Sequence, residues 1–288
     1  MSSLKITTLS TMLADRGIGE WGYAALIEVD DKKILFDTGQ KPQTVLANAN
    51  ELGIDLADVE DVFLSHNHFD HTGGILTLRR ALKKINPNAL SRIHVGKGIF
   101  IPRDKFYNMD QIKKELEADG VQFFIYEDPN ELFPGVWITG PVKRIHPEKN
   151  WYPGNKIMID GTEVEDNIPE DQSLAIETPN GFVLVSGCGH AGIVNTLESI
   201  KSNIKDKKIT TVIGGFHLVS ATDQHLAWTA EKLKDFGVVN VIGSHCTGIN
   251  SLYTLRNLLD LDRKHAVVGS VGDSYDLEKG IKAGYIAR

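Results

Sequence analysis

The chain has 288 residues, of which 41% are hydrophobic and 24% are charged, and this composition is ordinary for a globular protein. The formal net charge is −7, and an acidic surface repels a phosphate backbone, so we expect no nucleic-acid partner. Two cysteines provide no disulfide framework. Because the N-terminus lacks an apolar signal core and no apolar run is long enough to span a bilayer, we expect a cytoplasmic protein without a membrane partner.

Short apolar runs alternate with segments of helical periodicity, and we predict that the runs are buried strands. Strands that are apolar along their whole length are buried on both faces, so helices must cover the sheets. The runs lie at residues 34–36, 62–64, 182–185, 211–213 and 238–242. Each run is soon followed by a histidine or an aspartate, which are Asp37, His66, His190, His217 and His245. Since sites in open α/β sheets collect beyond the carboxyl ends of strands, we expect these side chains to gather around one centre.

The segment from His66 to His71 is the densest group of potential metal ligands in the sequence. Its pattern, H-x-H-x-D-H, places three imidazoles and one carboxylate within six residues. Imidazole is the commonest protein ligand for zinc and related ions, and carboxylate is a harder donor. His66 and His68 are two residues apart in an extended stretch and therefore point the same way, whereas Asp70 and His71 follow a turn later. The pattern predicts a part of a site that can hold two metal ions.

Residues 96–171 differ in character from the rest of the chain. The stretch is rich in proline, carries several aromatic residues and holds only short strand-like pieces, such as residues 121–126. We predict a single domain over residues 1–288, in which residues 96–171 are an insertion between the metal motif and His190. The insertion is expected to form a wall or a lid of the pocket.

The chain resembles the metallo-β-lactamase superfamily in several motifs. These are Leu-Phe-Asp-Thr-Gly at residues 35–39, the metal motif with its flanks at residues 65–74, His190 and His245, in the family's order. The resemblance implies an α/β fold, a four-layer αββα sandwich, with a dinuclear metal site at one edge of the facing sheets. Residues 187–195, 214–218 and 244–248 resemble a subgroup labelled as metal-dependent hydrolases of β-lactamase superfamily II. That subgroup also includes an archaeal transferase that acts on a dihydropterin.

The resemblance also implies two sets of metal ligands, one of His66, His68 and His190, and the other of Asp70, His71 and His245. Asp37 would hydrogen-bond a ligand histidine or the loop backbone and so fix its orientation. The expected cofactor is one or two divalent metal ions. Zinc suits the imidazoles best, and manganese, iron or nickel are alternatives.

The sequence departs from the family in one place. The family usually has an aspartate, sometimes a cysteine, beside the metals on the strand between His190 and His245. Here that strand runs into residues 214–218, Gly-Gly-Phe-His-Leu, which contain no acid. We predict that His217 lies near the site as a substrate contact or proton donor, and a metal ligand or a structural histidine are the alternatives.

Several residues outside these motifs are candidates for contact with a small-molecule substrate. Trp151 and Tyr152, together with the aromatic residues at 106 and 107, could stack on a flat ring, although aromatic side chains more often pack in a core. Arg103 and its neighbouring cations could pair with a phosphate or carboxylate. His146 in the insertion is a further candidate. Glu20, in a glycine-rich loop, is either at the edge of the metal site or a solvated loop carboxylate.

The two cysteines are weaker candidates. Cys188 precedes His190 by two residues and Cys246 adjoins His245. Thiolate is a strong zinc ligand, but free cysteine is among the most buried residue types and six other ligands already suffice. We therefore predict that neither cysteine binds metal.

The expected function is that of a metal-dependent hydrolase. A metal-activated hydroxide, oriented by Asp70, would attack an acyl or phosphoryl centre of a small substrate that is anionic or contains a ring. His217 or a bound water would give the leaving group its proton. Two alternatives stay open. One is a metal-dependent transferase that joins a pterin-like diphosphate to an aromatic acceptor, and the other is a non-catalytic metal or ligand sensor.

Overall fold

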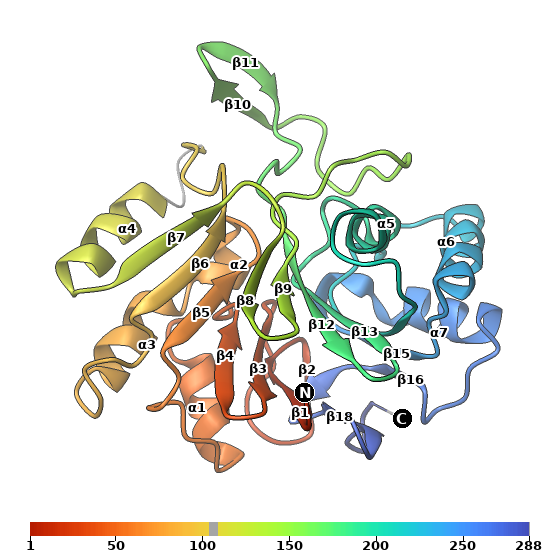
Figure 1. Cartoon of the computed structure of the whole chain (residues 1–288), viewed down its shortest axis with the longest axis horizontal. Coiled ribbons are helices and arrows are strands. Elements are labelled where there is room, and N and C mark those ends of the chain that lie inside the picture. The colour runs from red at the N-terminus through yellow and green to blue at the C-terminus, as the bar shows by residue number, and fades with distance from the viewer. Residues whose placement is uncertain (104–108, 288) are drawn as a thin grey trace.

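The computed structural model describes residues 1–103 and 109–287, and two β-sheets lie face to face at its centre (Figure 1). The first sheet has eight strands in the order β19-β18-β1-β3-β4-β5-β6-β7. Its strands are β1 (Leu4–Ser10), β3 (Ala24–Val29), β4 (Lys32–Phe36), β5 (Asp61–Leu64), β6 (Arg92–Gly96), β7 (Gln122–Tyr126), β18 (Ser274–Asp276) and β19 (Gly280–Lys282). The strands from β4 to β7 are parallel, and the others pair antiparallel.

The second sheet has seven strands in the order β16-β15-β14-β13-β12-β9-β8. Its strands are β8 (Asn130–Phe133), β9 (Val136–Ile138), β12 (Ser173–Thr178), β13 (Gly181–Ser186), β14 (Ile209–Gly214), β15 (Asn240–Gly243) and β16 (Ala266–Val268). The strands from β13 to β16 are parallel, and β12, β9 and β8 pair antiparallel. A small sheet of β2 (Leu13–Ala14) and β17 (Ser270–Val271) lies apart from these two.

Helices cover the outer face of each sheet. On the first sheet these are α1 (Thr44–Glu51), α3 (Ile75–Leu82) and α4 (Met109–Ala118), and on the second α5 (Ile193–Asn203), α6 (Asp223–Phe236) and α7 (Ile249–Leu258) (Figure 1). The short helices α2 (Phe69–Thr72) and η1 (His245–Thr247) belong to loops that follow strands. In the described residues no helix is both long enough and apolar enough to cross a membrane.

Three apolar cores separate these four layers, and the alternation of side chains along each strand explains them. In β5, Val62 and Leu64 face the helices, whereas Phe63 faces the other sheet. In β14, Val212 faces the helices and Ile213 faces the first sheet. Both faces of these strands are therefore buried, which is why the sequence shows continuous apolar runs. The predicted four-layer αββα sandwich is confirmed.

Part of the range of residues 96–171 belongs to the sandwich itself, so the insertion is shorter than the sequence predicts. Within this range α4 and β7 complete the first half of the sandwich, and β8 and β9 extend the second sheet. The strands β7 and β8 are half-exposed and lie at sheet edges, and β9 has only three residues, so none of them shows the continuous apolar pattern that marks the central strands. Residues 139–172 remain outside the sheets, and their hairpin of β10 (Lys156–Ile159) and β11 (Thr162–Glu165) projects away from the body (Figure 1).

Candidate metal centre

The predicted strand ends meet at one edge of the sandwich. Within each sheet the relevant strands are parallel, so β4 and β5 end on the same side, as do β13, β14 and β15. Two groups of potential ligand atoms lie there, each with its atoms within 4.8 Å of one another. One group is His66, His68 and His190, and the other is Asp70, His71 and His245. The structure thus brings together both sets that the sequence predicts, and metal binding to them stays a prediction.

The two sets are adjacent, and several of their ligand atoms are almost in contact. In the first set, His190 Nε2 lies 3.2 Å from His68 Nδ1. In the second, His245 Nε2 lies 3.1 Å from an Asp70 carboxylate oxygen and 3.3 Å from His71 Nε2. The rings of His66 and His71 join the sets, with centroids 4.3 Å apart. Such spacing lets ligands from both sheets face a common centre.

The local backbone explains how one short motif serves both sets. His68 is extended and is the N-cap of α2, which is a single turn that carries Asp70 and His71. The chain then passes against the loop after β4, where only glycine fits. A Cβ at Gly73 would lie 2.1 Å from the Gln40 carbonyl oxygen, so a side chain there would displace the motif.

Asp37 connects the loop after β4 to the motif. One of its oxygens accepts the Ser65 amide at 2.8 Å, and the other accepts the Ser65 hydroxyl at 2.7 Å and contacts His71 Nδ1 at 2.7 Å. Asp37 has φ of 53°, and His217 and His245 also have positive φ, of 50° and 48°. Non-glycine residues seldom adopt this conformation, and its concentration here is typical of a functional site. Asp37 therefore contacts both a candidate ligand histidine and the loop backbone, and its role in orienting metal ligands stays a prediction.

Two ring nitrogens show that the first set fits a metal ion. His66 contacts the Ser65 hydroxyl through Nδ1 at 2.9 Å, while its buried Nε2 has no hydrogen-bond partner in the part of the chain that the structure describes. His190 Nδ1 bonds to the Asn150 carbonyl, which leaves its Nε2 facing His68. A buried polar atom without a partner is costly. The Nε2 lone pairs of His66 and His190 are therefore available to a metal ion. Imidazole is a donor of intermediate softness, which suits zinc or a related divalent ion.

The protonation states favour a cation in the first set. Burial lowers the pKa of His66 and His190 well below the usual value, and it lowers the pKa of His68 to about 4. In the second set, burial alone would lower the pKa of His71, but Asp37 and Asp70 raise it to about 9. The first set therefore presents neutral imidazoles at pH 7, whereas His71 must release a proton before it can bind a metal ion.

Two of the predicted substrate residues are held by contacts within the protein. Glu20 is buried and accepts hydrogen bonds from the Ser10 hydroxyl at 2.7 Å and from two backbone amides after Gly39, at 3.0 and 2.9 Å. Arg103 pairs with Asp166 at 2.6 Å and with Glu170 at 2.7 Å. Glu20 is thus an anchor for loops, and the charge of Arg103 is already balanced. Sequence could not reveal these partners because most of them are distant in the chain.

The other predicted substrate residues lie on residues 139–172 or outside the described part. The His146 ring lies 6.0 Å from Trp228 of α6, and Arg144 stacks over Trp151 at 5.4 Å. Tyr152 is 71% exposed. None of these three candidates belongs to the two groups of ligand atoms. The candidates at residues 105–107 lie outside the described residues.

The structure also reveals three residues near the centre that the sequence did not single out as ligands or substrate contacts. Trp21 is 45% exposed, and its ring centroid lies 4.7 Å from that of His245. Phe69, inside the metal motif, is 44% exposed. Cys188 is buried and its sulfur lies within 4.8 Å of ligand nitrogens of His66 and others. An aromatic residue inside the metal motif was the signal that could have identified Phe69, whereas Trp21 is distant in the sequence from every predicted ligand.

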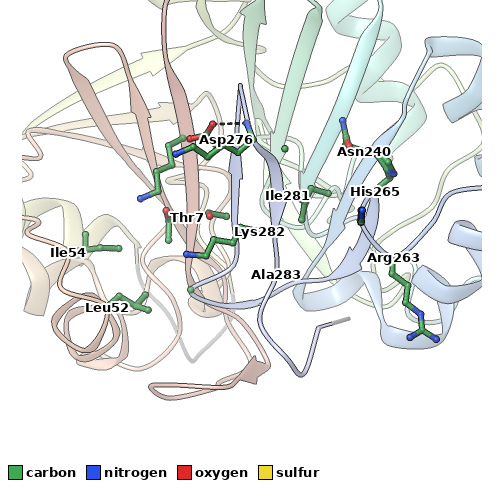
Figure 2. A pocket seen from close by; sticks show the side chains of 16 residues that line it. Thr7, Leu52, Ile54, Asn240, Arg263, His265, Asp276, Ile281, Lys282 and Ala283 are labelled. Atoms are coloured by element: carbon green, nitrogen blue, oxygen red, sulfur yellow. Dashed lines mark hydrogen bonds between the residues drawn. The ribbon is translucent and has the colours of Figure 1, made fainter.

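A cavity of about 1110 Å³ lies elsewhere on the molecule (Figure 2). Asn240, at the start of β15, lines it, whereas His245 follows the end of that strand. The cavity is therefore at the opposite end of β15 from the candidate ligands, and none of them lines it. Its lining carries Lys5, Arg263 and Lys282, but among the described residues it holds no group of metal ligands.

The family of this chain follows from its fold, its site and its sequence relatives. A model of the metallo-beta-lactamase superfamily matches residues 22–160. The strand-end ligands and the αββα layers agree with that match. The chain belongs to the metallo-β-lactamase superfamily.

Individual relatives cover nearly the whole chain. It is 33% identical to 7,8-dihydropterin-6-methyl-4-(β-D-ribofuranosyl)-aminobenzene-5'-phosphate synthase of Methanocaldococcus jannaschii, over 92% of this chain and 96% of that protein. It is 30% identical to an uncharacterized protein of the same archaeon, over 87% of this chain and 91% of that one. It is also similar to the crystal structure of Tm1679, a metal-dependent hydrolase of the β-lactamase superfamily. That comparison has a TM-score of 0.73 and 25% identity, over 94% of this chain and 98% of that chain.

Proposed function

We propose that the chain is a metal-dependent hydrolase that cleaves a phosphoryl or acyl bond of a small molecule. The observation that carries this proposal is the pair of adjacent ligand sets, in which the buried His66 Nε2 has no hydrogen-bond partner among the described residues. When bound there, divalent metal ions supply Lewis acidity and lower the pKa of a water molecule toward about 7. The sandwich holds the ligands on loops that follow rigid strands, which suits such chemistry.

Two residues of the chain complete the proposed reaction. Burial raises the pKa of Asp70, but His71 and His245 together lower it below the usual range, so Asp70 is ionised and can accept a hydrogen bond from a water nucleophile. The ring of His217 lies 4.6 Å from that of His190. Burial would lower the pKa of His217, but the neighbouring Cys246 raises it. A protonated His217 beside the site can give a leaving group its proton.

A second candidate function is transfer of a pterin-like group from a diphosphate to an aromatic acceptor. The 33% identity to the archaeal synthase over almost the full length of both chains supports it. Trp21 and Phe69, both partly exposed beside the ligands, offer apolar faces on which a flat ring can stack. Identity alone does not decide between these functions, because an uncharacterized protein of the same archaeon is almost as similar, at 30%.

One set of assays tests both functions. The protein, loaded in turn with zinc, manganese or iron, is incubated with bis(p-nitrophenyl) phosphate, with p-nitrophenyl acetate, and with a dihydropterin-methyl diphosphate. The last substrate is tested with and without an arylamine acceptor. Hydrolysis products that are independent of acceptor support the hydrolase, and a coupled product supports the transferase. Turnover that persists after complete chelation would contradict both, and metal binding without any turnover would favour the sensor.

A further inference from the structure

We propose that Cys188 is a metal ligand of this centre and that its thiolate is shared between the two ligand sets. The inference rests on the metal centre of the proposed function, but it does not depend on which reaction occurs there. It adds one anionic donor to the six ligands that the sequence predicts.

The position of the Cys188 sulfur carries this proposal. It lies within 4.8 Å of ligand nitrogens of His66 and His71, and these histidines belong to different sets. It forms two further groups of the same size, one with His190 and His217 and the other with His245 and Cys246, so it also reaches one residue of each set. A donor atom within reach of both sets is placed where it can serve two ions at once. The partnerless Nε2 of His66 in the same group shows that these atoms need a further partner.

Glycines on both sides of Cys188 allow this close approach. A Cβ at Gly187 would lie 2.1 Å from the Ser65 hydroxyl, so the loop after β13 packs directly against the loop after β5. Gly189 has φ of +64°, which reverses the chain between Cys188 and His190. The Cys188 residue is 3% exposed. Its side chain is therefore directed into the ligand cluster and away from solvent.

The charge of the centre gives a chemical reason for a thiolate. Asp70 is the only anionic side chain among the six predicted ligands, whereas two divalent ions carry four positive charges. The loop of residues 214–218 contributes no acid. Thiolate is a strong zinc ligand, and a metal ion removes the thiol proton when it binds. The S–H bond of Cys188 breaks, a metal–sulfur bond forms, and the proton passes to solvent without any change in oxidation state.

Cys246 lies beside Cys188 but has a different set of contacts. The two sulfur atoms are 3.0 Å apart. Cys246 also accepts the backbone N–H of His217 at 3.3 Å and donates to the Cys188 carbonyl at 3.4 Å. The Cys188 S–H donates to the Cys246 sulfur, so Cys246 is the hydrogen-bond acceptor of the pair. Because the Cys246 sulfur also lies within 4.8 Å of a His245 nitrogen, Cys246 is the matched comparison, a buried cysteine of the same cluster.

The test is to load the full chain with cobalt(II) and to record its absorption spectrum. Thiolate ligation gives an intense charge-transfer band in the near ultraviolet, which imidazole and carboxylate ligands do not give. We expect this band in the wild-type protein and in Cys246→Ser, and we expect its loss in Cys188→Ser. Circular dichroism and thermal unfolding check that both variants fold. Zinc X-ray absorption supplies a second measurement, in which a sulfur neighbour at about 2.3 Å should vanish only in Cys188→Ser.

Each of the other possible cobalt and zinc results would overturn either the role of Cys188 or the metal centre itself. Two equivalents of cobalt that bind without the band would overturn the role of Cys188 and leave the metal centre of the proposed function intact. A band that is lost in Cys246→Ser and kept in Cys188→Ser would show that Cys246, and not Cys188, is the ligand. Failure of cobalt and zinc to bind at all would overturn both the inference and the proposed function.

Discussion

Asp37 Oδ2 and His71 Nδ1 are 2.7 Å apart, and both side chains are fully buried. This contact leaves the other nitrogen of His71, Nε2, facing His245 Nε2 at 3.3 Å. Asp37 thereby fixes the ring of a predicted ligand of the second set, while Ser65 fixes the position of Asp37. Carboxylates that orient ligand histidines in this way contribute to metal affinity without touching the metal ion.

The substitution Asp37→Asn tests this relationship. An asparagine can place only one acceptor oxygen where Asp37 has two, so either His71 or Ser65 loses its partner. We expect metal affinity at the second set to fall roughly 10- to 100-fold, with a smaller change at the first set. Isothermal titration with zinc in a competing chelator measures both. Ser65→Ala is the matched comparison, because it removes a neighbour of Asp37 and keeps the contact with His71, and an equal loss in both variants would contradict the orienting role.

Removal of His190 tests the first set. We expect His190→Ala to lose bound metal at that set and to lose turnover, because its Nε2 faces His68 and its other nitrogen is held by the Asn150 carbonyl. Elemental analysis after gel filtration measures the metal content. The control is His265→Ala, since the His265 ring is half exposed and pairs with Asp262 at 2.7 Å, outside the ligand cluster. Equal metal content in His190→Ala and wild type would rule His190 out as a ligand.

A methyl group at Gly187 should damage the centre through the backbone. Its Cβ would lie 2.1 Å from the Ser65 hydroxyl and 2.6 Å from an Asp37 carboxylate oxygen, so Gly187→Ala forces the two loops apart. We expect a loss of about 1–3 kcal/mol in the free energy of unfolding and weaker metal binding. Gly53→Ala is the comparison, because a Cβ added at Gly53 would have no described atom within 4 Å. The loss of stability in that variant comes only from the positive φ of 68°. Urea unfolding and zinc titration separate the two effects, and metal binding unchanged in Gly187→Ala would contradict this account.

Glu148 should make stability depend on pH. Its carboxylate accepts the backbone N–H groups of Val194 and Asn195 at the start of α5, at 3.2 and 2.8 Å. Burial nevertheless raises its pKa to about 7, although these hydrogen bonds act against the rise. Between pH 4.5 and 7 the folded chain keeps a proton that the unfolded chain has lost, so this group's contribution to stability falls as pH rises through that window.

The variant Glu148→Gln isolates this contribution. We expect the difference in unfolding free energy between pH 5 and pH 7.5 to be smaller in the variant than in the wild type, by up to about 3 kcal/mol. Urea unfolding of the metal-free proteins at the two pH values gives this difference, and titrations common to both proteins cancel. An identical pH dependence in the two proteins would show that Glu148 titrates with an ordinary pKa.

The sequence by itself determined the buried strands covered by helices and the metal motif, because continuous apolar runs and a turn that carries His66, His68, Asp70 and His71 are short local patterns. The four layers and the two complete sets of ligands came from the resemblance of the motifs to the metallo-β-lactamase superfamily. His190 and His245 could be found because each follows such a run. The strand-like piece at residues 121–126 corresponds to β7, whereas β8 and β9 were missed, since β8 is a half-exposed edge strand and β9 has only three residues.

Only the tertiary structure decided the surroundings of those ligands. Arg103 was predicted as a substrate cation, but Asp166 and Glu170, more than 60 residues away, balance its charge. Cys188 was predicted not to bind metal, yet the close packing of the loops at Gly187 and Gly215, which have no side chains, places its sulfur among the candidate ligands of both sets. Ligand identity depends on residue type and local spacing. The partner of a charged or thiol group depends on which distant loops pack together, and no local pattern encodes that.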